Sequence, residues 1–459
     1  MKDPLIPLLS EGAPVLVLGL GSSGISAANL LAQMGCAVEV SEKTSRKDSM
    51  VDLSRLHPSI VIHWGGHPEE LLNRFPLIII SPGVPYDLEA LQAAARNGAK
   101  ILGEMELAFR MTTVPWVAIT GSNGKSTTVT LLDLMAREGG LRVQTGGNLG
   151  KPVTRFVSEE DAPDFIVAEV SSFQLETVEA FRPAMAAMLN LSPDHLDRHA
   201  GIEEYVDAKL RIFSRMDEND WAVLNDDDDW ISRVTESLTV NRFPFSRKHL
   251  LAKGAFVREG WIVVRDGDEE YPVASTKSLA LAGTHNLENA LAATALACRM
   301  GIERGAMTKV LQSFAGLEHR MELLGYFRGV PVYNDSKGTN TGATMRSLEG
   351  MGGDVTLILG GKDKGTSYEL LEKIIRRKVS HLILLGEAAK RMKTAFNGAA
   401  DIVVVKDLDE AVRVAVQRAR PGSEILFSPA CSSFDMFSGY EERGRVFKEA
   451  ARKYMGLAR

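Results

Sequence analysis

The sequence contains few cysteines and no long apolar run. Cys36, Cys298 and Cys431 are odd in number, lie far apart and form no CxxC pair, which excludes a disulfide framework or a zinc cluster and is typical of a reducing compartment. No apolar stretch approaches the roughly 18 residues that a membrane-spanning helix requires. Residues 1–14 are interrupted by three prolines and make a poor signal peptide. We therefore expect a cytoplasmic protein without membrane insertion.

The chain also lacks an excess of positive charge. Lys and Arg number 53 against 59 Asp and Glu, so the net charge is −6. We expect no nucleic-acid partner, because such partners are usually bound through a basic field. Any anionic ligand must then be held by a local site. With 45% hydrophobic and 24% charged residues the composition is that of a globular protein, and 459 residues predict about three domains of roughly 150 each.

Short apolar segments alternate with helical segments along nearly the whole chain, which predicts an α/β protein with parallel sheets covered by helices. We place its domains at 1–103, 104–315 and 316–459. Helices are predicted at 25–34, 104–111, 125–138 and 285–301, and a hairpin at 261–273, where Asp266-Gly267 forms the turn. Strands are predicted at 15–19, 37–42, 61–66, 77–83, 116–119, 165–170, 186–191, 330–335, 355–361, 381–386, 401–405 and 424–430.

A glycine loop follows the first predicted strand. Gly19, Gly21 and Gly24 have the G-x-G-x-x-G spacing, which allows a tight turn, close approach of the backbone to a diphosphate and helix–strand packing. The helix N-terminus offers free N–H groups to the phosphates. Glu42, after the next strand, lies where an acid would accept ribose hydroxyls. NAD, another nucleotide diphosphate, or a glycine turn without a ligand all fit this motif.

A second loop, TGSNGKST at 120–127, stands between a buried strand and a helix. Backbone N–H groups of such a loop surround phosphates, Lys125 neutralises phosphate oxygens, and Ser126 reaches Mg²⁺. Ile119 replaces the first glycine of the usual G-x-x-x-x-G-K-[ST] pattern, so the match to that pattern is partial. The loop predicts a nucleoside triphosphate site, with a capped helix start and a solvated lysine as the alternative.

Several side chains are candidates for a metal site near this loop. Glu169 ends a buried strand, where ligands bind in open α/β sheets. His195 follows another buried strand, and its i,i+4 pairing with His199 lacks the glutamate of an HExxH zinc motif. Lys209 lies in a helical segment whose chemistry alone indicates a solvated or salt-bridged surface lysine. The acidic run 226–229 favours a helix-capping turn over a metal site, because adjacent acids point in alternate directions.

Two phosphate-binding loops in separate domains imply two phosphorylated ligands, and a third α/β domain can bring another reactant. His319-Arg320 and the run 334–340 supply charged groups where that domain begins, and an arginine is a common stabiliser of transferring phosphoryl charge. Alone, each segment also fits a solvated loop. The combination suggests activation of an acceptor by phosphoryl transfer, and the residues do not identify the acceptor.

With these motifs assembled, the chain resembles the Mur ligases along essentially its whole length. In this family the shortened loop GSNGKST is the normal form. EVSSFQLE (169–176), NDSKGTN (334–340) and SPACSSFDMF (428–437) resemble the D-glutamate-adding member, and the Asp-Asn-Pro-Arg run of another member is absent. The remaining matching runs are SPGVP (81–85), GGNLGKP (146–152), DHLDRH (194–199), AKLRIF (208–213), GTHNLENALAA (283–293), HR (319–320) and LGGKDKG (359–365).

The resemblance implies a Rossmann-like N-terminal domain that binds UDP, a central P-loop ATPase-type domain and a Rossmann-like C-terminal domain that binds the amino acid. It implies a monomer that uses ATP and two Mg²⁺ ions to join D-glutamate to UDP-N-acetylmuramoyl-L-alanine through an acyl phosphate. It further implies that CO₂ carbamylates Lys209, so that this side chain becomes an anionic metal ligand.

The resemblance also assigns a role to particular residues. Lys125, His195 and Lys209 match catalytic positions, and Ser126, Glu169, His195 and Lys209 match metal ligands. The ATP set is Gly121, Ser122, Asn123, Gly124, Lys125, Ser126, Thr127, Asn286, Asn289, Arg320, Asp335 and Lys337. The set for the UDP substrate is Gly21, Ser22, Glu42, Ser81, Gly83 and Asn148, and the D-glutamate set is Thr339, Lys364, Ser433 and Tyr440.

Three other hypotheses remain at this point. An NAD-dependent oxidoreductase would use the first glycine loop and leave the second without a purpose. A non-catalytic nucleotide-binding module would not turn over ATP in response to an acceptor and an amine. A sister ligase would add a different amino acid.

Overall fold

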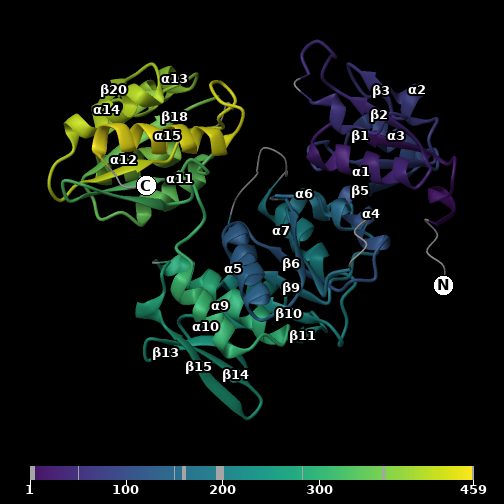
Figure 1. The fold of residues 1–459 in the computed structure, drawn as a ribbon, viewed down its shortest axis with the longest axis horizontal. Coiled ribbons are helices and arrows are strands. Elements are labelled where there is room, and N and C mark those ends of the chain that lie inside the picture. Colours follow the sequence, from purple (N-terminus) through teal and green to yellow (C-terminus); the bar gives the residue numbers. More distant parts are fainter. Residues whose placement is uncertain are drawn as a thin grey trace. The chain divides into compact units, whose positions relative to one another are not determined.

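The computed structural model describes residues 6–49, 51–148, 150–157, 162–192, 201–281, 283–363 and 367–456. The chain divides into two compact units, residues 1–314 and 315–459, and Figure 1 follows it from purple to yellow. Mostly parallel sheets covered by helices confirm the predicted α/β class. No helix among the described residues is long and apolar enough to cross a lipid bilayer.

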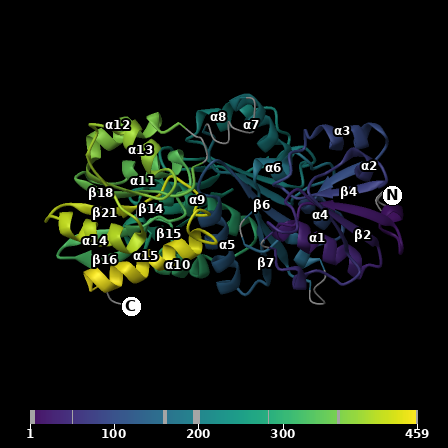
Figure 2. The same cartoon turned by 90° about the horizontal axis from the view of Figure 1, so that it is seen from above.

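The first unit begins with a parallel sheet of order β3-β2-β1-β4-β5. Buried side chains on its two faces pack against α1 and α3, and Figure 2 shows these helices on opposite sides of the sheet. The predicted strands of this region are confirmed. The elements are β1 (Pro14–Leu18), α1 (Ser22–Gln33), β2 (Ala37–Glu42), β3 (Val61–Trp64), α2 (Glu69–Leu72), β4 (Leu77–Ile80), α3 (Glu89–Arg96) and β5 (Lys100–Gly103).

The turn from β1 into α1 depends on the glycines of the first loop. Gly19 has φ of +90°, a left-handed value that favours glycine. A Cβ at Gly24 would overlap the carbonyl oxygen of Gly19 and lie 2.7 Å from Ser81 Oγ. The spacing therefore has a packing role in this protein, independent of any ligand.

Replacing Gly24 by alanine is expected to destabilise the sheet around β1 by about 3 kcal/mol, because the added methyl group overlaps a backbone oxygen that cannot move away freely. Hydrogen exchange of the β1 amides measures this loss. Gly21→Ala is the matched control, since Gly21 has φ of −68° and a Cβ there meets nothing within 4 Å. Equal exchange rates in the two variants would contradict the packing role.

The central sheet has the order β11-β10-β9-β6-β8-β7, and a smaller sheet has the order β12-β13-β14-β15. The antiparallel β14–β15 pair confirms the predicted hairpin. The helix predicted at 125–138 is α5, followed by Gly139-Gly140 as expected. The bounds are α4 (Glu104–Arg110), β6 (Trp116–Thr120), α5 (Lys125–Glu138), β7 (Val143–Gly147), β8 (Phe165–Glu169), α6 (Ser172–Leu175), β9 (Met185–Met188), α7 (Ile202–Leu210), β10 (Trp221–Leu224), α8 (Asp229–Val234), β11 (Asn241–Arg242), β12 (Phe245–Ser246), β13 (Gly254–Arg258), β14 (Trp261–Asp266), β15 (Glu269–Ser275), α9 (Thr284–Arg299) and α10 (Arg304–Ser313).

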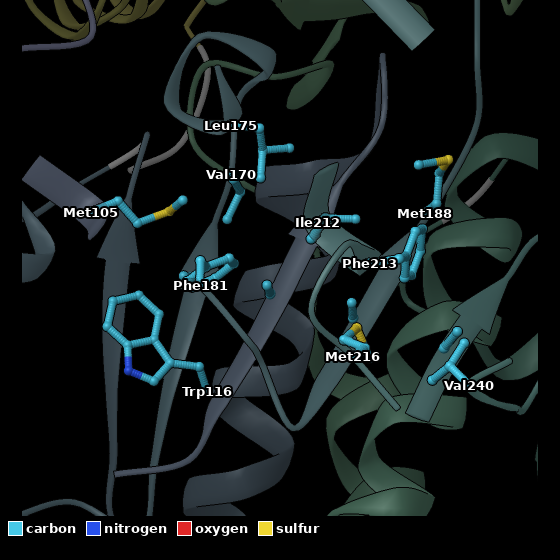
Figure 3. Close-up of a cluster of buried hydrophobic side chains, with 14 of the residues drawn as sticks. Met105, Trp116, Val170, Leu175, Phe181, Met188, Ile212, Phe213, Met216 and Val240 are labelled. Carbon is cyan, nitrogen blue, oxygen red and sulfur yellow. The ribbon is translucent and has the colours of Figure 1, made fainter. Parts of the chain in front are cut away.

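A buried aromatic core supports the start of β6, the strand that leads into the second loop. Trp116 and Phe181 pack edge to face with ring centroids 5.6 Å apart, and Phe109 meets both rings. Figure 3 shows Trp116 and Phe181 with Met105 and Leu175 in this cluster. Because close-packed side chains fix β6, the loop that follows it has a rigid base. Helices α5 and α9 lie side by side next to this loop (Figure 1).

The second unit has a sheet of order β16-β17-β21-β18-β19-β20, in which only the β16–β17 pair is antiparallel. The predicted strands are confirmed, and β16 is an additional edge strand. Helices α14 and α15 pack on one face, and α11, α12 and α13 on the other. The bounds are β16 (Glu322–Phe327), β17 (Val330–Asn334), α11 (Thr341–Glu349), β18 (Val355–Gly360), α12 (Glu369–Lys378), β19 (Val379–Leu385), α13 (Ala389–Ala395), β20 (Asp401–Val404), α14 (Leu408–Arg418), β21 (Glu424–Phe427) and α15 (Tyr440–Met455).

Glu104, the first residue of α4, is a buried acid with an unusual environment. Its Oε1 accepts hydrogen bonds from the Thr154 backbone N–H and hydroxyl, both at 2.7 Å, while its Oε2 has no partner. Burial raises the pKa of Glu104 to about 7, against the lowering effect of the bonds from Thr154. The folded protein therefore keeps a proton on this group that the unfolded chain releases at lower pH.

This proton makes stability depend on pH. Between its ordinary pKa of 4.5 and about 7, the unfolded state releases the proton first, so the contribution of Glu104 to stability falls as pH rises through this range. Relative to Glu104→Gln, which carries no charge, the unmodified protein is expected to lose about 3 kcal/mol between pH 5 and pH 8. Thermal unfolding at both pH values checks this. A difference between the two proteins that does not vary with pH would contradict it.

Candidate active site

The second loop adopts the conformation expected of a phosphate cradle. Gly121 and Gly124 have φ of +149° and +85°, which L side chains rarely adopt. A Cβ at Gly124 would also overlap Asn289 Oδ1 on α9. Lys125 begins α5, and its Nζ donates to the carbonyl oxygens of Gly121 at 2.7 Å and Ser122 at 3.1 Å. The ammonium group thus lies against the loop, at a helix N-terminus suited to anions.

Polar groups after β9 hold this loop, and sequence reasoning did not select them. The Asn190 carbonyl accepts from the Ser122 N–H at 2.9 Å, and Asn190 Oδ1 accepts from the Asn123 N–H at 2.8 Å. The Tyr205 hydroxyl lies 3.0 Å from Ser122 Oγ. The sequence offered one signal, because Asn190 lies at the carboxyl end of the predicted buried strand 186–191, and the carboxyl ends of parallel strands share one edge.

The other predicted ATP residues of the first unit lie on the helices beside the loop. Ser126 and Thr127 are buried in the first turn of α5. Asn289 is buried on α9, where its Oδ1 lies 3.4 Å from Thr128 Oγ1, and Asn286 is one turn earlier on the same helix. The structure therefore brings Asn289 to the loop from a position far along the chain.

Glu169 ends β8 directly beside the loop, since it pairs with Ile119 of β6. Its side chain is only 3% exposed, Oε1 accepts from Asn148 Nδ2 at 2.9 Å, and Oε2 is buried without a hydrogen-bond partner. A buried, unpartnered carboxylate oxygen is a suitable ligand for Mg²⁺. Across the described part of the chain, no three His, Cys, Asp or Glu side chains gather closely enough to hold a metal together.

Lys209 is the clearest departure from an expectation based on residue chemistry. The prediction of a solvated or salt-bridged surface lysine is wrong, because Lys209 on α7 is only 2% exposed. Its Nζ donates to the Gly121 carbonyl at 3.1 Å and lies 3.3 Å from Thr120 Oγ1 and 4.6 Å from the centre of the Tyr205 ring. A long cationic side chain is thus buried against the phosphate-binding loop, which is costly unless the charge is paired or hydrogen-bonded.

One further sequence expectation is confirmed, and two predicted site residues lie outside the described part of the chain. The acidic run 226–229 forms a capping turn, as favoured: Asp228 accepts from the N–H groups of Trp230 and Ile231 at the start of α8, and Asp227 accepts from the Arg247 N–H. His195 and Lys364 lie outside the described residues, so their predicted roles stay predictions.

The predicted residues for the UDP substrate gather around the first glycine loop. Ser22 opens α1 after Gly21, and Ser81 lies 3.3 Å from the Gly19 carbonyl oxygen, with Gly83 in the same turn. The carboxylate of Glu42 accepts from the N–H groups of Leu20 at 2.7 Å and Thr44 at 2.9 Å. Burial would raise the pKa of Glu42, but these bonds lower it overall. Asn148 is different from the others in this set, because its side chain donates a hydrogen bond to Glu169, the candidate metal ligand.

In the second unit, three chain segments meet at the carboxyl edge of the sheet. The Lys337 N–H donates to the His319 carbonyl at 2.9 Å, next to Arg320, and Lys337 Nζ lies 5.7 Å from the centre of the Tyr440 ring. Buried Arg443 ties the segments together through the carbonyls of Ser336 at 2.7 Å and Cys431 at 3.0 Å. Sequence reasoning missed Arg443, whose position one turn inside α15 gave no functional signal.

Asp335, Thr339 and Ser433 complete this second cluster. Asp335 Oδ2 accepts from the hydroxyls of Ser347 and Ser428, both at 2.7 Å. Burial raises the pKa of Asp335 against these bonds. The Thr339 N–H donates to the Lys337 carbonyl, and buried Ser433 follows the Ser432 carbonyl that accepts from the Lys362 N–H. Thr339, Ser433 and Tyr440 thus come from the segments gathered at this edge.

The fold and these loops define an α/β nucleotide-phosphate-binding protein of three domains. Family models match the chain at 13–103 (Mur ligase MurD-like, N-terminal domain), 119–297 (Mur ligase middle domain) and 319–431 (Mur ligase, glutamate ligase domain). With relatives at about 40% identity over nearly its full length, the chain belongs to the Mur ligase family.

The curated relatives include UDP-N-acetylmuramoylalanine–D-glutamate ligases of Geotalea uraniireducens, 43% identical over 95% of this chain and 97% of the relative, and of Acidobacterium capsulatum, 41% identical over 98% of both. Among solved structures, UDP-N-acetylmuramate-alanine ligase MurC from Thermotoga maritima has a TM-score of 0.58 at 18% identity, covering 96% of this chain and 99% of that one. MurF ligase from Thermotoga maritima in complex with ADP has a TM-score of 0.57 at 16% identity, covering 97% and 96%. These two structures show the fold.

Proposed function

We propose that this protein is an ATP-dependent ligase that joins D-glutamate to UDP-N-acetylmuramoyl-L-alanine and releases ADP and phosphate, a step in peptidoglycan precursor synthesis. The full-length similarity to relatives named for this reaction carries the proposal. The buried Glu169 and Lys209 beside the second loop support it, because that loop binds phosphates in the proposed reaction. We place the reaction in the cytoplasm and the enzyme as a monomer, with domains at 1–103, 104–315 and 316–459.

The loop and α5 bind the phosphates of ATP. Backbone N–H groups of residues 121–127 at the start of α5 donate to phosphate oxygens, and Lys125 turns from the loop carbonyls to these oxygens. Asn286 and Asn289 contact the nucleotide from α9. Arg320, Asp335 and Lys337 are the other residues of the proposed ATP set. The conformations of Gly121 and Gly124 support this role, because their φ values give the loop a backbone shape that residues with side chains rarely adopt.

The residues present fit Mg²⁺. Glu169 offers an unpartnered oxygen, and the hydroxyl of Ser126 lies at the start of α5, as ligands of a phosphate-bound ion do. His195 and carbamylated Lys209 are the proposed further ligands of two ions. Mg²⁺ neutralises phosphate charge and aligns the reacting oxygens when bound. Lys209 Nζ lies 3.1 Å from the Gly121 carbonyl oxygen, so a carbamate on this side chain would lie beside the phosphate-binding loop.

The chemistry proceeds in two steps. A carboxylate oxygen of UDP-N-acetylmuramoyl-L-alanine attacks the γ-phosphorus of ATP, the bond to the β–γ bridging oxygen breaks, and ADP leaves. The D-glutamate amine then attacks the acyl carbon, loses a proton, and phosphate leaves with the new amide in place. Lys125 offsets the repulsion between the carboxylate and the triphosphate. Excluding water protects the acyl phosphate from hydrolysis.

Each substrate has its own set of residues in this proposal. Gly21, Ser22, Glu42, Ser81, Gly83 and Asn148 bind the UDP substrate. Thr339, Lys364, Ser433 and Tyr440 bind D-glutamate, and the charge of Lys364 suits its carboxylates. The gathering of Thr339, Ser433 and Tyr440 at one sheet edge supports this second set.

Phosphate release from ATP, measured with Mg²⁺, UDP-N-acetylmuramoyl-L-alanine and a panel of D- and L-amino acids, tests the proposal. We expect release with D-glutamate alone, together with a product of the mass of the new amide. Release with another amino acid would assign a sister ligase. A folded protein that binds ATP and releases phosphate with none of them would refute the ligase activity.

A further inference from the structure

The turn between β10 and α8, residues 225–228, does more than begin a helix, and we call it the acidic turn. Asp228 caps α8, as the sequence led us to expect. The same carboxylate also accepts from the Leu191 N–H at 2.9 Å, and buried Asn225 donates from Nδ2 to the Leu189 carbonyl at 2.8 Å. The acidic turn therefore also holds the chain that continues from the carboxyl end of β9.

The smaller sheet holds the acidic turn from its other side. The Asp226 N–H donates to the Phe245 carbonyl at 2.9 Å. The Asp227 side chain is 3% exposed and accepts from the Ser246 hydroxyl at 2.6 Å and the Arg247 N–H at 2.8 Å. Breaking one side of such a buried hydrogen bond leaves a polar group unpaired, which is costly. The acidic turn is thus a fixed support for the chain after β9.

Reciprocal hydrogen bonds join the chain after β9 to the phosphate-binding loop. The Asn190 side chain bonds the backbone of Asn123 in both directions, because Oδ1 accepts from its N–H at 2.8 Å and Nδ2 donates to its carbonyl at 3.1 Å. The Ser122 hydroxyl does the same to Ser192, with its N–H and its carbonyl both at 2.9 Å. Two neighbouring residues of the loop are therefore fixed to the end of one strand.

The fixed residues lie directly before the part of the loop that would meet phosphates. Asn123 precedes Gly124, which has φ of +85°, and Lys125, the first residue of α5. A displacement of Asn123 would therefore move the N–H groups at the start of α5. A loop that is already fixed loses little conformational entropy on binding, and its N–H groups need not reorient toward the charge of the ligand.

We propose that Asn190 is a positioning residue for the phosphate-binding loop and that the acidic turn, through Asp228, keeps Asn190 in place. The proposal rests on the proposed function, in which this loop binds the phosphates of ATP. Asn190 acts through Asn123 and does not itself bind the nucleotide. The acidic run of the sequence thus serves nucleotide binding from a distance, in addition to capping α8.

Titration calorimetry of the full-length protein with Mg-ADP and, separately, with UDP-N-acetylmuramoyl-L-alanine tests the role of Asn190. Asn190→Ala is expected to weaken Mg-ADP binding about tenfold or more, because both bonds to Asn123 are lost. Binding of the UDP substrate, which the proposed function assigns to the first glycine loop, should stay unchanged. A general loss of structure would instead weaken the binding of both ligands.

Asp228→Ser separates the two roles of Asp228. Serine caps a helix about as well as aspartate, but its single oxygen cannot also reach the Leu191 N–H. Asp228→Ser is therefore expected to weaken Mg-ADP binding about threefold, as Asp228→Ala does. Asp407→Ser, the same substitution at the N-cap of α14, is the matched control and should leave the affinity unchanged. Asp228→Ser also tests the proposal if Asn190→Ala does not fold.

Several results would overturn the proposal. Unchanged Mg-ADP affinity in Asn190→Ala would remove Asn190 as a positioning residue. Unchanged affinity in Asp228→Ser, when Asp228→Ala has lost affinity, would reduce Asp228 to a helix cap. Equal weakening of both ligands would show a general structural effect. An unmodified protein that binds the UDP substrate but not Mg-ADP would refute the ATP role of the loop in the proposed function, and this proposal with it.

Discussion

Lys209→Ala is expected to lower the rate of ligation about a thousandfold while leaving the protein folded, because it removes a charged group buried against the phosphate-binding loop. The carbamate account makes a sharper prediction. A short carboxylate such as acetate or propionate should enter the space left by the side chain and restore part of the rate, since it supplies the anionic oxygen that the carbamate would provide.

Steady-state ligation rates with increasing acetate, propionate and methylammonium measure this rescue. Lys393→Ala on α13, where the lysine is exposed, is the control and should behave like the unmodified protein. Rescue by methylammonium instead of the carboxylates would show that Lys209 acts as an ammonium group. A Lys209→Ala variant with full activity would contradict the carbamate claim altogether.

Glu169→Gln is expected to lower the ligation rate about a hundredfold and to raise the Mg²⁺ concentration needed for half-maximal rate. The substitution conserves shape and an acceptor for Asn148, but it replaces the unpartnered carboxylate oxygen by an amide nitrogen that cannot bind a cation. The effect should therefore appear in the magnesium dependence more than in the stability of the fold.

Initial rates across a magnesium titration check this result. Glu349→Gln, an exposed substitution at the end of α11, should leave the magnesium curve unchanged. An unaltered curve for Glu169→Gln would remove Glu169 from the set of metal ligands.

The sequence predicted the elements of this fold well where local signals were strong. The helix α5 agrees with its prediction because a glycine loop begins it and Gly139-Gly140 follow it. The hairpin β14–β15 agrees because Asp266-Gly267 lies between alternating runs. The short strand β16 gave no such signal, since its exposed and buried positions do not alternate cleanly along an edge.

The surroundings of individual side chains were much harder to predict from the sequence than the helices and strands. Lys209 looked solvated because helical context alone does not show what packs against α7, and its burial arises from contacts with residues about 90 positions away. Asn190 and Arg443 act on loops distant in sequence. Burial raises the pKa of Glu104 and its bond with Thr154, which spans 50 residues, lowers it; neither effect is visible in the local sequence. Spacing and position after predicted strands indicated the two loops and Glu42, Glu169 and His195, whereas the resemblance supplied the other site residues.

The central claim is that the substrate carboxylate is phosphorylated before the amide forms, and oxygen transfer tests it directly. UDP-N-acetylmuramoyl-L-alanine labelled with ¹⁸O in its carboxylate, incubated with ATP, Mg²⁺ and D-glutamate, is predicted to deliver one labelled oxygen to each phosphate released, as phosphorus-31 NMR or mass spectrometry would detect. Released phosphate without ¹⁸O, accompanied by formation of the amide, would contradict the acyl-phosphate mechanism.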